Sequence, residues 1–489
     1  MSICNLLRGR FRRATIMAAA AGLLAAASLQ TAVANPTPQN TISYIMVIEL
    51  ENESYATTFG PSSPAVYLNR HLLRKGELIP NWFATGHVSL DNYIAQLSAQ
   101  GSTPSTNSDC INAATISQGN LTGQYFDVSP GTRDPNQANF PGQVDGDGCI
   151  FPQPGAHWNW MGDGVRTIGD QLDEKYGQVE FSSTGIIYTP GPIEWREYAE
   201  DMGNTPSRDN GDPDPLGGTD CAHPVNGGPD NTNAATSADQ YATRHNGFMY
   251  FHSVIDNQAR CDAHVVPLGT VSVGTGPRGS DVFAGHLYQD LQSLSTTPKF
   301  MFITPNLCDD GHDATCAGTN TEGGKAGGLV GADLWLKHWM PMIFASPAYQ
   351  SGQLLVVLTF DEGSVSDTAA CNPKLTADQA ICNYPIGPNI TNFGYSPLLG
   401  HYHIQNPPGT TGVYPGGGQI GAVLFNSLFI KPGSVNTMGQ YNHYSALRSY
   451  EDLLHIRKGD DGLGHLGYAA RDTLIGATFG SDVFNKIQQ

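Results

Sequence analysis

Charged side chains are scarce in this sequence, and basic ones are the scarcest. Asp, Glu, Lys and Arg make up 14% of the 489 residues, and 25 Lys and Arg stand against 44 Asp and Glu, for a formal net charge of −19 at pH 7. A chain with this excess of acid has no electrostatic attraction for nucleic-acid backbones or anionic membrane surfaces. The composition therefore argues against both as bound partners.

Long apolar runs are also missing, except near the N-terminus. Four arginines precede an apolar run at residues 16–29, and Ala32-Val33-Ala34 follows it. A basic region, a short apolar run and an Ala-x-Ala site are typical of an export signal, whereas a transmembrane anchor needs a longer and more apolar run. We expect residues 1–34 to be a signal peptide cleaved after Ala34. The mature protein would then be secreted or periplasmic and have no stable membrane anchor; the Sec and twin-arginine routes both stay open.

Closely spaced Cys-x-x-Cys pairs are absent, which argues against a structural zinc site. One of the nine cysteines, Cys4, leaves with the signal peptide, so an even number remains in an oxidising compartment. We therefore expect disulfides. Spacing does not determine how they connect, and the pairs we suggest are Cys110–Cys149, Cys221–Cys261, Cys308–Cys316 and Cys371–Cys382.

Glycine and proline are abundant, with 57 and 32 residues, so loops must occupy much of the chain. Residues 203–240 are dense in Gly, Asp, Asn and Pro and lack the apolar residues of a core. We expect a plain surface loop there, because its acids lack the ordered spacing of a calcium-binding loop. No internal repeat is present, and residues 35–489 are expected to form a single domain.

Three apolar, β-branched segments predict buried strands, at residues 42–50, 299–304 and 354–360. Helical spacing of apolar residues lies between the last two, at 331–343, and another helix is expected over 91–100. Strands that alternate with helices indicate an α/β fold with a mostly parallel central sheet sandwiched by helices.

Each of these strands runs into acidic residues: Glu51-Asn52, Asp309-Asp310 and Asp361-Glu362. The carboxyl ends of parallel strands meet at one edge of a sheet, which is where such folds bind ligands. Acids in this position can also simply cap helices and turns. Carboxylates together with His87, Ser89, His312 and His443 suit a site that binds divalent cations and activates a hydroxyl.

These segments resemble the phosphoesterase family that groups bacterial phospholipases C with secreted acid phosphatases, within the alkaline phosphatase superfamily. The segment Ile45–Tyr55 is similar to the family's strand followed by Glu-Asn, and His87–Tyr93 looks like the His-Pro-Ser-x-x-Asn-Tyr segment of its acid phosphatases, with Val88 in place of Pro. Further resemblances lie at residues 195–202, 244–246, 303–313, 344–349, 360–362, 416–421 and 441–452.

The resemblance implies an alkaline-phosphatase-like fold and a role for each matching residue. Ser89 would be the nucleophile, and His87, Asn92 and His245 would contact phosphate oxygens or protonate the leaving group. One metal would be held by Glu51, Asn52, Ser89, Asp361 and Glu362. A second would be held by Asp309, His312 and His443, although Asp309 and His312 are closer in sequence than the superfamily's usual pair. One or two divalent ions are therefore expected, and Zn, Ca, Mg and Mn all stay open.

The function that this resemblance favours is an acid phosphatase that acts on small phosphate esters. The alternatives are a phospholipase C or other phosphodiesterase acting on phospholipid, and a secreted binding protein without turnover. The individual residues also have structural alternatives: Ser89 could cap a helix, His312 could belong to a disulfide-bound turn, and His443 could cap the last helix. The sequence leaves the oligomeric state open.

Overall fold

The central strand of the fold is β1 (Tyr44–Leu50), in which all seven residues are buried. In the computed structural model, residues 36–111, 123–130, 142–156, 164–232, 235–312, 315–318, 327–364, 395–396, 401–402 and 416–486 are described. Nearly all of them belong to one compact unit, Thr37–Gln489. The expected signal peptide, residues 1–34, lies outside the described residues.

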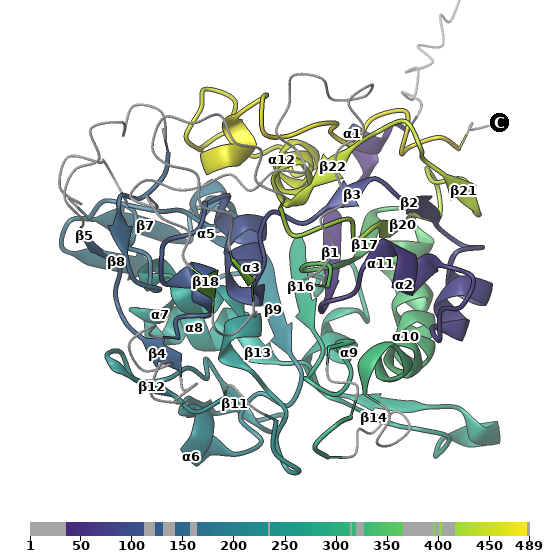
Figure 1. Ribbon diagram of the computed structural model, residues 1–489, viewed down its shortest axis with the longest axis horizontal. Helices are drawn as coiled ribbons and strands as arrows, with labels where there is room; N and C mark the ends of the chain where they lie inside the picture. The colour runs from purple at the N-terminus through teal and green to yellow at the C-terminus, as the bar shows by residue number, and fades with distance from the viewer. Residues whose placement is uncertain are drawn as a thin grey trace, which may run out of the picture. The chain divides into compact units, whose positions relative to one another are not determined.

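An eight-stranded sheet is built around β1 (Figure 1). Its order is β13 (Val265–Pro267), β9 (Trp195–Ala199), β16 (Phe300–Thr304), β1, β17 (Leu354–Phe360), β20 (Ala422–Phe425), β2 (Glu77–Ile79) and β21 (Ser434–Val435). Every neighbouring pair is parallel except the two that involve β20, which is antiparallel to both β17 and β2. The expected mostly parallel sheet is confirmed.

Helices cover both faces of this sheet. The described helices are α1 (Pro38–Thr41), α2 (Tyr55–Phe59), α3 (Ser89–Ser98), α5 (Ile168–Lys175), α6 (Pro206–Asp209), α7 (His252–Ile255), α8 (Gln258–His264), α9 (His286–Asp290), α10 (Gly328–Ala345), α11 (Pro347–Gln350) and α12 (His443–Leu453).

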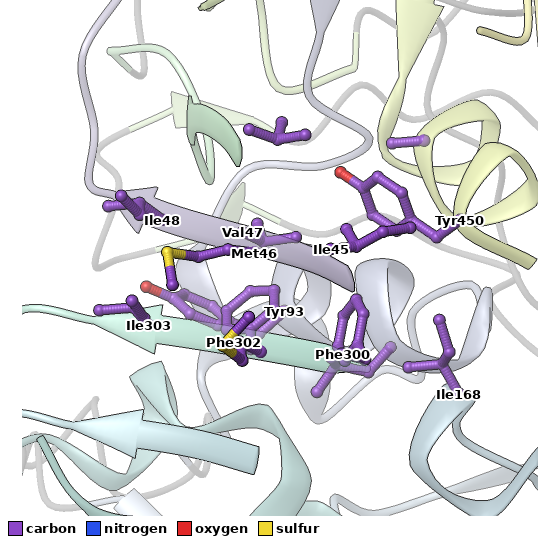
Figure 2. Close-up of a cluster of buried hydrophobic side chains, with 14 of the residues drawn as sticks. Ile45, Met46, Val47, Ile48, Tyr93, Ile168, Phe300, Phe302, Ile303 and Tyr450 are labelled. Carbon is purple, nitrogen blue, oxygen red and sulfur yellow. The ribbon is translucent and has the colours of Figure 1, made fainter. Parts of the chain in front are cut away.

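The alternation of side chains along the strands assigns the helices to faces. Phe300 and Phe302 point to one face, where Phe302 contacts Tyr93 of α3 and Phe300 contacts Tyr450 of α12 (Figure 2). Tyr198 of β9 points to the opposite face and donates a 2.6 Å hydrogen bond to Asp290 of α9. The expected α/β class, with helices on both sides of the sheet, is confirmed.

Short two-stranded ladders occupy the connections between these elements. They are β3 (Trp82–Phe83) with β22 (Tyr441–Asn442), β4 (Gly123–Tyr125) with β12 (Gly228–Asp230), β5 (Ser129–Pro130) with β6 (Gly146–Asp147), β7 (Val179–Ser182) with β8 (Gly185–Tyr188), β10 (Asp212–Pro213) with β11 (Thr219–Asp220), β14 (Thr270–Ser272) with β15 (Val282–Ala284), and β18 (Tyr395–Ser396) with β19 (His401–Tyr402). Within the segment 203–240, α6, β10, β11 and β12 are formed, and some of its polar side chains are buried.

Three of the four suggested disulfides are present: Cys110–Cys149, Cys221–Cys261 and Cys308–Cys316. Cys371 and Cys382 lie outside the described residues. Structural disulfides of this kind fit an oxidising compartment. Across the described ranges, no helix combines the length and the apolar character needed to cross a bilayer.

Candidate active site

Parallel pairing of β1 and β17 brings two acidic strand ends together. Leu50 is in register with Phe360, so Glu51 and Asp361 leave the sheet side by side. The backbone N–H of Asp361 donates to the carbonyl of Leu50 at 2.8 Å, and the N–H of Asn52 donates to Asp361 Oδ1 at 2.8 Å. The structure therefore places Glu51 and Asp361 at the same edge of the sheet.

Ser89 is the first residue of α3, and its hydroxyl points at the same carboxylate. Ser89 Oγ donates a 2.8 Å hydrogen bond to Glu51 Oε2. One helical turn later, Tyr93 OH donates to Glu51 Oε1 at 2.6 Å, because residues four apart share a helix face. Both oxygens of a fully buried Glu51 are thus aligned by α3.

The turn that precedes Ser89 is held in an unusual backbone conformation. Val88 has φ = 109°, which a β-branched residue rarely adopts. Asn92 secures the turn, since its Oδ1 accepts from the N–H groups of Thr85 and Gly86 and its Nδ2 donates to the carbonyls of Gly86 and Val88, each at 3.0 Å. These bonds occupy the amide of Asn92, so this geometry places Asn92 as a positioning residue for Ser89.

The side chain of Glu362 lies against His87, which belongs to the turn that precedes Ser89. Its Oε2 lies 2.5 Å from His87 Nδ1 and accepts the N–H of Val88 at 3.2 Å. Burial raises the pKa of Glu362 well above its ordinary value, and the charge of Asp361 adds to this effect. His87 Nδ1 and Glu362 Oε2 are therefore within hydrogen-bonding distance in the turn that precedes Ser89.

His245 lies on the other side of Glu51. Its Nε2 is 3.4 Å from Glu51 Oε1, its Nδ1 is 3.5 Å from Asp310 Oδ2, and its ring stacks on Tyr93. Burial and the nearby positive charge of Arg244 lower the pKa of His245 well below its ordinary value, so the imidazole is neutral. Asp310 was not among the predicted site residues, although its neighbour Asp309 was.

Asp309, His312 and His443, the predicted second metal set, are placed in different surroundings. Asp309 is buried, and its Oδ1 faces Gly331 in the first turn of α10. His312 is exposed. His443 begins α12 and its Nε2 donates to the carbonyl of Asp361 at 2.7 Å, while burial lowers its pKa to about 4. Asp309 faces α10 and His443 bonds the carbonyl of Asp361, so a metal shared by these two residues and His312 stays a prediction.

A pocket of about 300 Å³ opens over Ser89. It is lined by Asn52, Val88, Ser89, Asp109, Arg244, His312, Glu362 and Ser364. Arg244 and Asp109 were not predicted; the Nε of Arg244 is 3.9 Å from Asp109 Oδ2, and Asp109 Oδ1 accepts the N–H of Leu90 at 3.0 Å. Arg244 immediately precedes His245, so the motif that pointed to His245 already contained it.

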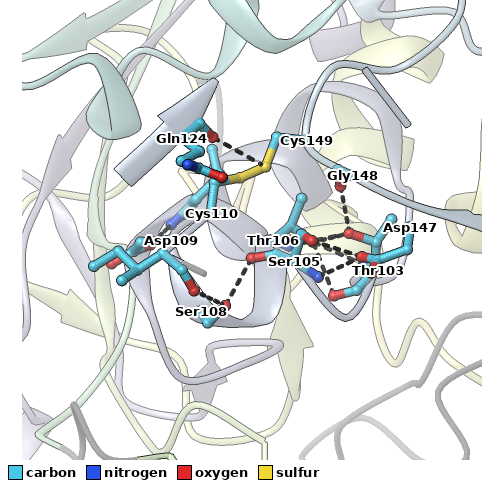
Figure 3. The surroundings of a disulfide bond; sticks show 12 residues. Thr103, Ser105, Thr106, Ser108, Asp109, Cys110, Gln124, Asp147, Gly148 and Cys149 are labelled. Atoms are coloured by element: carbon cyan, nitrogen blue, oxygen red, sulfur yellow. Dashed lines mark hydrogen bonds between the residues drawn. A yellow bond between two sulfur atoms is a disulfide. The ribbon is translucent and has the colours of Figure 1, made fainter. Parts of the chain in front are cut away.

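A disulfide anchors the loop that carries Asp109 (Figure 3). Cys110 follows Asp109 directly and is bonded to Cys149. In the same loop, Ser105 donates from its N–H and its hydroxyl to Asp147 Oδ1, at 2.9 and 2.6 Å. Asp109 is therefore held against the first turn of α3 by covalent and polar bonds together.

The acids at this edge of the sheet have the properties of ligands for a cation. Burial raises the pKa of Glu51 well above its ordinary value, with added repulsion from Asp361 and Asp310, and burial raises the pKa of Asp361 to about 6. Oδ2 of Asp361 is buried and accepts no hydrogen bond from the described part of the chain. Oxygen donors with uncompensated charge fit a divalent ion, because such an ion neutralises them.

Comparison with models of protein families finds no match. Two curated relatives are similar over 246 residues, which is 50% of this chain. One is the phosphate-repressible acid phosphatase of Penicillium chrysogenum, at 27% identity and with 42% of its length covered. The other is an acid phosphatase of Aspergillus fumigatus, at 24% identity and with 39% of its length covered. The resemblance to acid phosphatases is confirmed. The chain matches about two fifths of the length of these relatives.

Three of the solved structures that resemble this chain are of phosphatase-type proteins. A Vibrio parahaemolyticus protein in the alkaline phosphatase superfamily is 11% identical, with 85% of this chain and 66% of that chain covered and a TM-score of 0.36. Murine ectonucleotide pyrophosphatase/phosphodiesterase 5 is 9% identical, with 88% and 100% covered and a TM-score of 0.34. A mutant of the alkaline phosphatase PafA is 11% identical, with 88% and 100% covered and a TM-score of 0.32. These TM-scores are too low to assign an activity.

Proposed function

We propose that this chain is a phosphoester hydrolase, and specifically an acid phosphatase acting on small phosphate monoesters. The observation that carries the proposal is Ser89, which lines the pocket together with Arg244 and whose hydroxyl donates to the buried Glu51. The two fungal relatives, which are acid phosphatases, support the reaction class.

Ser89 is the proposed nucleophile. Its Oγ attacks phosphorus and its proton passes to the ionised carboxylate of Glu51, which already accepts the hydrogen bond of the Ser89 hydroxyl. The bond from phosphorus to the ester oxygen breaks as the bond to Oγ forms. A proton shared by His87 and Glu362 would be near enough to the pocket to reach the departing alcohol oxygen. Water then hydrolyses the phosphoserine and releases phosphate.

Phosphate binding is assigned to Arg244 and the first turn of α3. A guanidinium forms two parallel hydrogen bonds to phosphate oxygens, and the N–H groups at the start of a helix favour anions. Arg244 lines the pocket together with Ser89, the first residue of α3, so these groups can bind the transferring phosphoryl group where the hydroxyl reaches it.

A divalent cation is part of this proposal, with Glu51, Asn52, Ser89 and Asp361 as its ligands. Bound there, the ion would neutralise phosphate charge and favour the ionised serine hydroxyl. The oxygen donors suit Mg, Mn or Ca, and the neighbouring histidines allow Zn.

Hydrolysis of p-nitrophenyl phosphate by Ser89→Ala and Ser98→Ala tests the nucleophile. Ser98 is a matched control because it is a buried serine of the same helix, whose hydroxyl bonds the Ile94 carbonyl and lies away from the pocket. We expect Ser89→Ala to lower kcat by at least about a thousandfold and Ser98→Ala to retain activity. Equal activity of Ser89→Ala and the parent would contradict the proposal that Ser89 is the nucleophile.

Three substrates distinguish the alternatives in the same assay. A monoesterase cleaves p-nitrophenyl phosphate faster than bis-p-nitrophenyl phosphate or phosphatidylcholine. Turnover of the lipid or the diester alone would overturn the monoester assignment, and no turnover of any of the three would favour a binding protein.

Chelation with EDTA should abolish activity, and one particular ion should restore it. Activity that resists chelation would contradict the proposed metal requirement.

Export from the cytoplasm is also proposed. The three disulfides support it, since such bonds persist in oxidising compartments. A periplasmic or extracellular phosphatase would release phosphate from esters outside the cell.

A further inference from the structure

A second cluster of ligand-type side chains lies outside the pocket. Asp214, Asp220 and His286 each offer one ligand atom, and these atoms all lie within 4.8 Å of one another. Across the described ranges, this is the one such trio of His, Cys, Asp and Glu side chains. Asp220 ends β11, Asp214 follows β10, and His286 begins α9, so the cluster joins the β10–β11 hairpin to a helix that covers the sheet.

Both carboxylates approach the same nitrogen of His286. Its Nε2 is 2.9 Å from Asp214 Oδ2 and 4.0 Å from Asp220 Oδ1. Other histidines between two aspartates are arranged differently: His252 meets Asp127 through Nε2 and Asp256 through Nδ1. When two carboxylates lie beside opposite ring nitrogens, no single ion can bind both of them and the imidazole. When both lie beside the same nitrogen, one ion can bind all three side chains.

One carboxylate oxygen of this cluster accepts no hydrogen bond from the described part of the chain. Oδ1 of Asp220 is buried and accepts no hydrogen bond from the described residues, and Asp220 as a whole is 8% exposed. Burial raises the pKa of Asp220 to about 7, with further repulsion from Asp214, Asp262 and Asp212. The nearest guanidinium, that of Arg196, is already bonded to Asp290 at 2.6 Å. The charge of Arg196 lowers the pKa of Asp220 only in part, and a bound cation would add the positive charge that favours its ionised form.

The distances suit a small ion. Oxygen and nitrogen ligands at about 2.0–2.2 Å from zinc stand about 3.3–3.6 Å apart in a tetrahedral site. The two separations from Nε2, 2.9 and 4.0 Å, lie on either side of that value, and all three ligand atoms lie within 4.8 Å of one another. The side chains of His286 and Asp220 are 14% and 12% exposed, which leaves access for the ion and for a water as fourth ligand.

From this geometry we infer that Asp214, Asp220 and His286 form a zinc site, distinct from the catalytic pocket. Two carboxylates and an imidazole are a donor set that zinc accepts, and the imidazole disfavours Ca²⁺ and Mg²⁺. The ion pins the β10–β11 hairpin to α9, next to the Cys221–Cys261 disulfide that tethers the same segment. Its effect is on the stability of this segment, and hydrolysis in the pocket does not depend on it.

Asp220→Asn and His286→Asn test the site in the full chain, with His252→Asn as the matched control. Each protein is stripped with a chelator and dialysed against buffered Zn²⁺; bound zinc is measured by mass spectrometry and the Tm with and without zinc by thermal unfolding. We expect Asp220→Asn and His286→Asn to bind one zinc fewer per chain than the parent, with affinity at the site at least about tenfold weaker. The Tm gain from zinc should shrink in both variants and persist in His252→Asn.

Asp220→Asn also separates metal binding from plain structure. Because Asp220 Oδ1 accepts no hydrogen bond, the zinc-free variant should be at least as stable as the zinc-free parent. Asp361→Asn, at the catalytic pocket, should retain this zinc. Equal zinc content and equal Tm gain in the parent, Asp220→Asn and His286→Asn would overturn the inference, and so would a matching loss of zinc in His252→Asn. Tighter binding of Ca²⁺ than of Zn²⁺ would overturn the assignment to zinc.

Discussion

Glu51 shows how one side chain organises the candidate site. It is fully buried, and it accepts hydrogen bonds from Ser89 and Tyr93 while lying 3.4 Å from His245. A carboxylate in these surroundings is costly to ionise, which is why its pKa rises. A bound cation would offset that cost and favour the ionised carboxylate, which the proposed role of Glu51 as proton acceptor and cation ligand requires.

Arg244 is the residue on which phosphate binding is predicted to depend. Arg244→Gln removes the guanidinium that lines the pocket and should lower kcat/KM for p-nitrophenyl phosphate by about ten- to a hundredfold, mostly through KM, because hydrogen bonds to charged groups contribute about 1.5–3 kcal/mol. Steady-state kinetics measure this. Arg448→Gln, which loses a surface pair with Asp472, is the control. Equal kinetics in both variants would contradict the role of Arg244.

At the scale of elements, α3 and the turn before it determine where the nucleophile stands. Val88, with φ = 109°, occupies the position at which the family that this chain resembles has proline. A proline ring holds φ near −65° and could not adopt this conformation, so the substitution is consistent with the turn seen here. Asn92 and Glu362 bond the backbone of Val88 and hold the strained turn in place.

The Cys110–Cys149 disulfide is predicted to support substrate binding as well as stability. The double variant Cys110→Ala/Cys149→Ala frees the loop that carries Asp109 and should raise KM. Loss of the cross-link should also lower the free energy of unfolding by about 4 kcal/mol in the chain-entropy model. Kinetics and denaturant unfolding measure the two effects.

The Cys221–Cys261 pair supplies a matched control for this variant. It spans 40 residues, against 39 for Cys110–Cys149, so its removal carries a similar entropic cost. Its residues do not line the pocket. We expect Cys221→Ala/Cys261→Ala to lose similar stability with an unchanged KM; an equal rise in KM would assign the effect to general loosening.

For the molecule as a whole, buried acids dominate the dependence of stability on pH. Burial is the leading cause of a raised pKa at Glu53, Glu77 and Asp209, each to about 7, and at Asp361, to about 6. An acid with a higher pKa in the folded chain binds more protons there than in the unfolded chain, so stability falls as the pH rises from about 4 to about 7.

We therefore expect the metal-free protein to have a higher Tm at pH 5 than at pH 7.5, by a few degrees or more. Buried histidines act in the opposite sense: the pKa of His264 and His443 is lowered to about 4 and that of His245 well below its ordinary value, so their contribution weakens as the pH falls from about 6.5. The acids outnumber them. Thermal unfolding across this range checks the sign, and a Tm that rises toward pH 7.5 would show that the histidines prevail.

Local pattern alone determined much of this protein. The apolar runs at 42–50, 299–304 and 354–360 became β1, β16 and β17, because a continuous buried run with β-branched residues has few other stable outcomes. The parallel order of those strands then placed Glu51 beside Asp361. Ser89 was identified through a resemblance, and the structure shows it to be the first residue of α3.

Tertiary structure alone decided which side chains meet across long separations in sequence. Arg244 and Asp109 line the pocket over Ser89. Asp310 approaches His245, whereas its neighbour Asp309 faces α10. Asp214 and Asp220 of the β10–β11 hairpin both approach Nε2 of His286 at the start of α9. Such contacts depend on how loops close over the sheet and on which ring atom faces which acid, and neither is encoded in the local periodicity of the chain.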